Sequence, residues 1–310
     1  MELKEQILEM LVDGERSGGK IAETLGVSRA AVWKCVRALQ KDGHNITAVT
    51  GSGYRLGPDN MLSAAKIKHF LRNEWQITTL AETTSTNDEA KRRAAATSER
   101  FVVIADRQTA GRGRLSRGFS SPAGAGLYMS AVVRPSLTLA DCGKITAYAG
   151  VVTARAVEKL CGEKVQIKWV NDLYINGKKI CGILTESSMS LESGTPEYAV
   201  VGIGVNVLGG ALPDFLKDVA TSVEAESGKR IDRNELAALI LDGLSDMDAE
   251  IEKGDFLDEY RARSCVVGHT VKVNDKFYAE ALAIDDDCAL LLKEGEKTMK
   301  FSAGEVSLKL

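Results

Sequence analysis

The stretch from Gly111 to Arg117 (GRGRLSR) places three arginines and two glycines within seven residues. An arginine guanidinium presents a rigid fork of donors that matches phosphate or carboxylate oxygens. Glycine accepts backbone angles that a Cβ forbids, so such a loop can be open when empty and wrapped around a bound anion. These residue types predict an anion-binding loop, with an ordinary solvated basic loop as the alternative.

Three small polar residues, Ser85, Thr86 and Asn87, precede an alanine-rich stretch that predicts a helix. One interpretation is a helix cap, in which the Ser85 or Thr86 side chain accepts from a backbone N–H three residues later. The other is a compact set of donors and acceptors for a neutral polar ligand. The sequence leaves both open.

A hairpin is predicted between Lys168 and Ile180, with its turn at Asn176-Gly177. Lys178 and Lys179 follow the turn on opposite faces of the strand, so one is solvated and the other can point inward. The apolar pattern does not decide which. Asn171-Asp172 fits either a strand-edge turn or part of a site.

The segment Gly202 to Asn206 (GIGVN) lacks the helix start and third glycine of a dinucleotide-binding loop. Glycines within a strand instead mark a place where a ligand or another part of the chain approaches closely.

The first 60 residues predict a helix-turn-helix followed by a wing. Apolar residues at 7, 8 and 11 fit one helix and residues 21–25 a second, and Ser28 caps a third helix in which Val32, Val36 and Leu39 face the core. Residues 46–49 and 54–56 predict two strands around a glycine turn. The third helix is then the DNA-reading helix.

Positive charge is concentrated in this region. Residues 16–55 hold seven Lys/Arg and two acidic residues, a local net charge of +5, although the whole chain has -3. A local positive patch suits contact with a phosphate backbone. The candidate DNA contacts are Ser28, Arg29, Lys34, Arg37 and Arg55. The alternative is a helical protein-interaction module.

Further along the chain, strands alternate with helices and then give way to short strands. Strands are predicted at 77–81, 101–105, 126–133, 166–169, 172–175, 179–186 and 199–207, with helices at 87–96, 139–160 and 233–251. Short strands at 270–273, 277–284, 289–292 and 298–301 predict a small SH3-like barrel. The fold class is therefore multidomain α+β, with domains at 1–60, 61–265 and 266–310.

Composition indicates a globular protein of a reducing compartment. The chain has 310 residues, 44% hydrophobic and 27% charged, and its six cysteines form no CxxC pair. The N-terminus lacks a signal-peptide pattern, and no apolar stretch is long enough to span a bilayer. We therefore expect a cytoplasmic protein without membrane contact.

Four motifs in this order closely resemble the bifunctional biotin protein ligases that also repress biotin operons. They are Ser85-Thr86-Asn87, Gly111-Arg112-Gly113-Arg114, the Lys168–Tyr174 segment (KWVNDLY) and Gly202–Asn206 (GIGVN). The resemblance covers essentially the whole chain, including the third helix and the wing. This chain departs from the family pattern at two places. It has Val170 where many members have Pro, and it lacks the Trp that many members have near the position of Phe119.

The resemblance implies that biotin and ATP give biotinyl-5'-AMP, with Mg²⁺ sharing the phosphate charge, and that a lysine then accepts the biotinyl group. It implies catalytic roles for Arg112, Arg114 and Lys179, which counter the charge on the α-phosphate. Biotin-binding residues would be Ser85, Thr86, Asn87, Gln108, Arg112, Gly113, Arg114 and Lys179. Asp172 and Asn206 are weaker candidates for adenylate or acceptor contacts, and no residue is assigned as a metal ligand.

The implied partners are the biotin carboxyl carrier protein of acetyl-CoA carboxylase, operator DNA of biotin genes, and a second copy of the chain in a ligand-induced homodimer. A lipoate ligase, a biotin sensor with weak or no ligase activity, and a regulator that binds another metabolite are the rival hypotheses.

Overall fold

The computed structural model describes residues 2–134, 142–189, 196–210 and 212–308. The chain divides into two compact units, one of residues 1–74 with 232–239 and the other of residues 75–231 with 240–310. The boundaries expected at residues 60 and 265 remain predictions. None of the described helices combines the length and apolar character that crossing a membrane requires.

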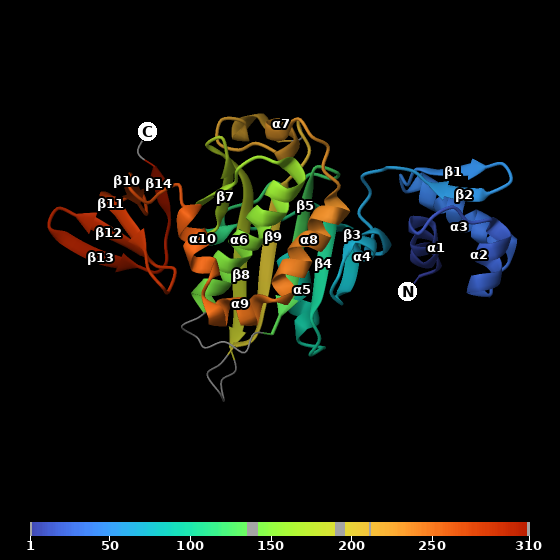
Figure 1. Cartoon of the computed structure of the whole chain (residues 1–310), viewed down its shortest axis with the longest axis horizontal. Helices are drawn as coiled ribbons and strands as arrows, with labels where there is room; N and C mark the ends of the chain where they lie inside the picture. Colours follow the sequence, from blue (N-terminus) through green and yellow to red (C-terminus); the bar gives the residue numbers. More distant parts are fainter. Residues whose placement is uncertain (1, 135–141, 190–195, 211, 309–310) are drawn as a thin grey trace. The chain divides into compact units, whose positions relative to one another are not determined.

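The first unit begins with a winged helix-turn-helix, as the sequence predicts (Figure 1). Its elements are α1 (Leu3–Val12), α2 (Gly18–Leu25), α3 (Arg29–Lys41), β1 (Ile46–Val49), β2 (Gly53–Leu56) and α4 (Ala64–Phe70). Ser28 caps α3 by accepting from the Ala31 N–H at 3.1 Å. Gly26 ends α2 in the left-handed conformation with φ 64°, which glycine adopts without a Cβ penalty. β1 and β2 pair antiparallel as the wing.

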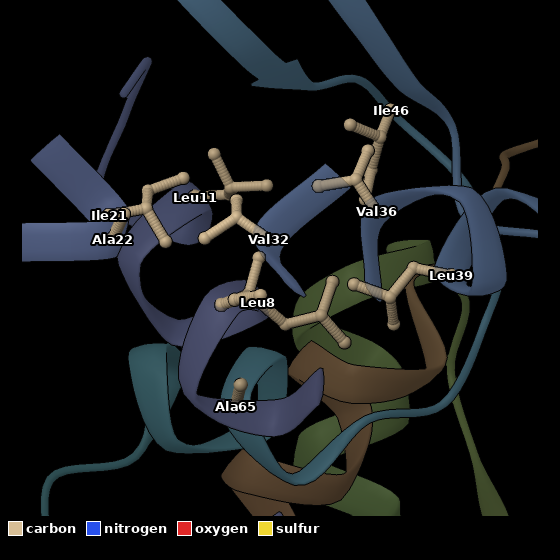
Figure 2. Close-up of a cluster of buried hydrophobic side chains, with 10 residues drawn as sticks. Leu8, Leu11, Ile21, Ala22, Val32, Val36, Leu39, Ile46 and Ala65 are labelled. Carbon is tan, nitrogen blue, oxygen red and sulfur yellow. The ribbon is translucent and has the colours of Figure 1, made fainter. Parts of the chain in front are cut away.

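One apolar cluster holds the helices of this unit together (Figure 2). Leu8 and Leu11 on α1 pack with Ile21 on α2 and with Val32 and Val36 on α3, and all five are buried. The spacing of these residues matches the helical period, so burial of one face fixes the orientation of α3 and leaves its charged face exposed.

A buried group of charges lies in the same unit. Asp59, after β2, contacts the Lys66 ammonium of α4, and its Oδ2 lies 3.4 Å from His44 Nδ1. Burial alone raises the pKa of Asp59, but His44, Lys66 and two backbone N–H donors outweigh it and hold that pKa well below its ordinary value.

A seven-stranded mixed sheet forms the centre of the second unit, in the order β3-β4-β5-β9-β8-β7-β6. Its strands are β3 (Gln76–Thr83), β4 (Phe101–Gln108), β5 (Gly126–Val133), β6 (Gln166–Lys168), β7 (Asp172–Ile175), β8 (Lys178–Met189) and β9 (Pro196–Asn206). Only β3 and β4 run parallel among these described pairs. β5 and β9 are buried along most of their length, so they carry the core of the sheet.

Two helices cover opposite faces of this sheet. α5 (Thr86–Ala94) packs through Ala90 against a cluster that contains Val200 of β9. α6 (Cys142–Cys161) lies over β8, where Thr146 Oγ1 lies 2.8 Å from Thr185 Oγ1 (Figure 1). Thr185 pairs with Val201, the neighbour of Val200, and adjacent residues of a strand face opposite ways. The α5 face is the one that carries the cavity described below.

The remaining elements belong to the second unit, except that residues 233–239 of α8 are counted with the first. They are η1 (Arg114–Ser116), η3 (Asp214–Leu216), α7 (Val223–Ser227), α8 (Arg233–Ser245), α9 (Met247–Lys253) and α10 (Phe256–Ala262). A five-stranded antiparallel sheet follows, in the order β13-β12-β11-β10-β14. Its strands are β10 (Thr270–Val273), β11 (Phe277–Ile284), β12 (Leu290–Glu294), β13 (Lys297–Phe301) and β14 (Val306–Leu308). The expected α+β class with a small C-terminal β-domain is confirmed.

One predicted element needs correction, and several short elements were missed. The single helix predicted at 233–251 is wrong, because α8 ends at Ser245 and α9 begins after Asp246. The Ser245 hydroxyl donates to the Leu241 carbonyl at 3.0 Å, and serine side chains that bond the backbone in this way weaken a helix. The short elements α4, α7, α10 and β14 were not predicted. The expected helix start at 139–141 lies outside the described residues.

Candidate ligand-binding site

A single cavity of about 290 Å³ in the second unit gathers most of the candidate residues. Small-molecule pockets begin at roughly 300 Å³, so this volume suits one compact ligand group. The predicted site residues on its lining are Ser85, Thr86, Asn87, Gln108, Arg112, Gly113, Arg114, Asp172 and Lys179. They come from four separate segments of the sequence.

The start of α5 is both a helix cap and part of the cavity. The Ser85 side chain caps α5 by accepting from the Asp88 N–H at 3.5 Å. Thr86 and Asn87 are buried on the cavity lining. The two interpretations of this motif are therefore compatible, because the cap uses the Ser85 hydroxyl only as an acceptor, and Ser85 lines the cavity together with its two neighbours.

Gln108, at the end of β4, fixes the position of Thr86. Its Oε1 accepts from the Thr86 backbone N–H at 2.8 Å, and its Nε2 donates to Ser121 Oγ at 2.9 Å. Because both ends of the Gln108 amide are bonded, its orientation is determined. It is therefore known which of its atoms donates and which accepts at this end of the cavity.

Arg112 and Arg114 lie in different surroundings. Arg112 pairs with Asp88 and lies 3.5 Å from Glu186. Arg114 donates to Asn171 Oδ1 at 3.0 Å and to the Gly304 carbonyl at 2.7 Å, which ties the loop to the C-terminal sheet. Each guanidinium keeps donors that can turn to a bound anion.

Neither Gly111 nor Gly113 adopts a left-handed backbone angle, and only Gly111 is required for space. Gly113 is extended, at φ -109°, whereas Leu115 has φ 51° and is exposed. A Cβ on Gly111 would lie 2.5 Å from the Phe119 carbonyl oxygen, which no side chain tolerates. Leu115 therefore carries the left-handed conformation that the sequence suggested for the glycines.

Lys179 points into the cavity, which answers the question that the sequence left open. Its Nζ lies 2.7 Å from Asp172 Oδ1, and both residues line the cavity. Lys178 points outward and donates to the Lys217 carbonyl. A partly buried ammonium at this place can stabilise negative charge on a ligand.

Two strand glycines let other side chains approach the sheet. A Cβ on Gly202 would collide with Asn87 Oδ1, and one on Gly204 would meet the Phe119 ring. Asn206 is placed differently. It is buried, does not line the cavity, and donates from Nδ2 to the Thr221 carbonyl at 3.1 Å.

The cavity also has residues that the sequence did not suggest. Lys272 of β10 and the nearby loop residues Asp275 and Glu305 line it, and Glu305 pairs with Arg117 at 2.6 Å. Glu186 does not line the cavity but supports its wall, because it accepts from the lining residue Asn87 and from Lys91. Burial raises the pKa of Glu186, but these two donors outweigh it, so the pKa is lowered. No local motif marks these residues, because only folding brings them to the site.

The candidate DNA contacts lie on the exposed part of the winged helix. Ser28, Arg29, Lys34 and Arg37 are exposed on or beside α3. Arg55 is exposed on β2 and is paired with Glu15. Trp33 was not among the predicted contacts. It is 58% exposed on α3, and the Arg37 guanidinium lies 5.9 Å from its ring centroid.

Comparison with known proteins assigns the chain to a family. The profile of the Biotin/lipoate A/B protein ligase family matches residues 78–206. The "Bifunctional ligase/repressor BirA" of Bacillus subtilis is 35% identical, over 94% of this chain and 93% of that protein. This chain belongs to the biotin protein ligase family. The Escherichia coli protein of the same description is 31% identical, over 98% and 96%.

The ends of this ligase match two further profiles. Residues 4–55 match an HTH domain, and residues 268–309 match the Biotin protein ligase C terminal domain. Together with the full-length relatives, they make the chain a ligase of the bifunctional ligase/repressor type.

Solved structures resemble the larger part of this ligase. The biotin protein ligase from Aquifex aeolicus, in complex with biotin and ATP, is 27% identical with a TM-score of 0.64. The match covers 76% of this chain and 98% of that one. A Leishmania major biotin protein ligase in complex with biotinyl-5-AMP is 26% identical with a TM-score of 0.54, over 74% and 100%.

Proposed function

We propose that this ligase uses ATP to activate biotin as biotinyl-5'-AMP and then transfers the biotinyl group to a lysine of a biotin carboxyl carrier protein. One observation carries the proposal. A single cavity has neutral polar groups of Thr86, Asn87 and Gln108 on its lining together with the cations of Arg112, Arg114 and Lys179. A ureido ring needs the first kind of group, and a phosphate needs the second.

In the first step, an oxygen of the biotin carboxylate attacks the α-phosphorus of ATP, and the bond to the β-phosphate oxygen breaks to release pyrophosphate. Two anions must approach each other, so repulsion and the growing charge on the α-phosphate oppose the reaction. Lys179 is partly buried beside Asp172 and stabilises that charge from a fixed position.

Arg112 and Arg114 act beside Lys179 as donors to the phosphate and carboxyl oxygens. The backbone of residues 112–114 covers the bound adenylate, and Ser85 completes the polar end that reads the ureido ring. Mg²⁺, when bound with ATP, shares the polyphosphate charge and takes mostly phosphate and water oxygens as ligands. The described residues contain no cluster of three or more acidic, histidine or cysteine side chains for such an ion, and Asp172 pairs with Lys179, so no protein ligand is assigned to it.

In the second step, the amine of the acceptor lysine attacks the acyl carbon, the bond to AMP breaks, and the amine loses a proton. The acceptor we propose is the biotin carboxyl carrier protein of acetyl-CoA carboxylase. Asn206 lies outside the cavity in this conformation, so its proposed contact requires the segment around it to move.

The winged helix supports a second function, transcriptional repression of biotin synthesis genes with biotinyl-5'-AMP as the corepressor. Ligand binding would favour a homodimer formed through the central sheet, and two winged heads would then meet a palindromic operator. The exposed cations of α3 and the wing favour this function over that of a ligase without DNA binding.

Two experiments test the two functions. Incubation with ATP, Mg²⁺, biotin and carrier protein should raise the carrier mass by one biotinyl group. A carrier with arginine at the acceptor lysine should not change, and an unmodified wild-type carrier would refute the ligase. Operator affinity should rise when biotin and ATP are added together, and equal affinities would refute the repressor coupling.

A further inference from the structure

Ser130 is a fully buried hydroxyl on β5 that touches two residues of the polar cavity wall. Its Oγ lies 2.6 Å from Asn87 Oδ1 and 2.7 Å from Thr86 Oγ1. Ser130 itself does not line the cavity. It can therefore affect a ligand only through these two neighbours.

The orientation of the Asn87 amide is fixed by its other contacts. Nδ2 lies 2.7 Å from Glu186 Oε2 and 3.3 Å from the Leu184 carbonyl, and both partners can only accept. The atom that faces Ser130 is therefore Oδ1, which also can only accept. The single proton of the Ser130 hydroxyl is needed for this contact.

Counting protons then sets the direction of the Thr86 hydroxyl. With its own proton on Asn87, Ser130 must accept at its 2.7 Å contact, so Thr86 Oγ1–H is the donor. Gln108 Oε1 lies farther from Thr86 Oγ1, at 3.1 Å, and already accepts from the Thr86 backbone N–H. Thr86 therefore presents only lone pairs to the cavity.

We propose that Ser130 is a positioning residue that makes Thr86 an obligatory hydrogen-bond acceptor, and so selects ligands that present an N–H at this point. A ureido ring has such an N–H, whereas a dithiolane ring of lipoate does not. The inference rests on the proposed biotin specificity and adds the group that enforces it.

The test compares biotin with its two cyclic carbamates, in each of which one ring N–H is replaced by oxygen. Calorimetry on the full-length wild type should show one carbamate binding at least about tenfold more weakly than biotin. In Ser130→Ala, the freed Thr86 proton can turn toward the ligand. Biotin binding should weaken by about tenfold while the difference between biotin and that carbamate nearly disappears.

Thr153→Val is the matched control. Thr153 is fully buried on α6, and its hydroxyl has no hydrogen-bond partner within the described chain, so this variant also loses one buried hydroxyl. It should keep all three affinities. If Ser130→Ala does not fold, Ser130→Cys, which keeps a weak donor of similar size, should show an intermediate difference.

The outcomes separate this inference from the proposed function. A wild type that does not bind biotin overturns both. A wild type that binds biotin, with the carbamate difference intact in the Ser130 variants, overturns the inference alone. Equal weakening of all three ligands means that Ser130 is merely structural, which also overturns it.

Discussion

Lys178 and Lys179 are adjacent, but only Lys179 lines the cavity. A β-bulge in β8 decides which of the two reaches it. The pairing of β7 with β8 shifts between Leu173 and Tyr174, so Ile180 is an extra residue in β8. This bulge puts Lys179 on the same face as Gly182. A Cβ added to Gly182 would lie 3.2 Å from the Lys179 ammonium nitrogen. Strict alternation cannot predict this, which is why the sequence left the choice open.

Lys179→Gln should slow adenylate formation by at least about a hundredfold, because it removes a fixed positive charge from the reacting phosphate. Pyrophosphate release in the presence of biotin and ATP measures the rate. Lys178→Gln is the control on the opposite face and should keep the wild-type rate. Similar rates in both variants would remove Lys179 from the catalytic role.

At the scale of elements, the loop at residues 111–117 is held by contacts that its own sequence does not reveal. Arg114 bonds to Asn171 of the β6–β7 turn and to Gly304 of the β13–β14 connection. A loop tied to two other elements can retain a reactive ligand while it is closed.

Arg114→Gly should release biotinyl-5'-AMP and biotinylate proteins without selectivity, because both of these contacts and the phosphate donor are lost. Ultrafiltration with mass spectrometry measures free adenylate, and an avidin blot of added serum albumin measures stray labelling. Arg107→Ala, on an exposed β4 position paired with Glu82, is the control. Retained adenylate and unlabelled albumin in Arg114→Gly would contradict the role of the loop.

The fluorescence of Trp33 on α3 can report DNA binding. Trp75 and Trp169 are 5% and 3% exposed, whereas Trp33 is 58% exposed on the proposed DNA-reading helix. Operator DNA should therefore quench the emission of Trp33 and shift it to shorter wavelength, as the indole leaves water. Trp33→Phe should remove this change. A change that persists in that variant would mean that α3 does not contact the DNA.

The buried charges around Asp59 should control the acid stability of the first unit. A carboxyl whose pKa is lowered by folding stabilises the protein above its unfolded value, about 3.9, and this stability is lost as the pH falls through and below that value. Asp59→Asn should cost about 3–5 kcal/mol at pH 7, since it leaves Lys66 buried without its partner. It should also flatten the pH dependence below pH 5.

Urea unfolding followed by circular dichroism, repeated from pH 3 to pH 7, measures this effect. Asp42→Asn is the control, because Asp42 forms an exposed pair with Lys4 at 2.6 Å. That pair should contribute less than about 1 kcal/mol. Equal losses in the two variants would contradict the special role of Asp59.

At the scale of the whole molecule, the bounds of strands with a regular apolar pattern could be predicted from the sequence. Residues that only folding brings to the site could not. The bounds of β5, β7, β10 and β11 agree with the sequence pattern, because burial there follows a simple alternation or a continuous apolar run. Thr86 and Arg114 stand out by local motif. Ser130, Glu186 and Glu305 do not, because their positions depend on contacts between segments far apart in the chain.

We propose that one cavity serves both activities of this ligase. In this proposal its polar wall selects the acid, its cations promote activation, and the bound adenylate is the signal for the winged helix. The whole proposal depends on which acyl group the cavity accepts.

The most direct test is mass spectrometry of acyl-adenylates after incubation of the full-length protein with ATP, Mg²⁺ and equal amounts of biotin and lipoate. We expect biotinyl-5'-AMP, with lipoyl-5'-AMP at background level. Lipoyl-5'-AMP as the main product, or neither adenylate, would contradict the proposal.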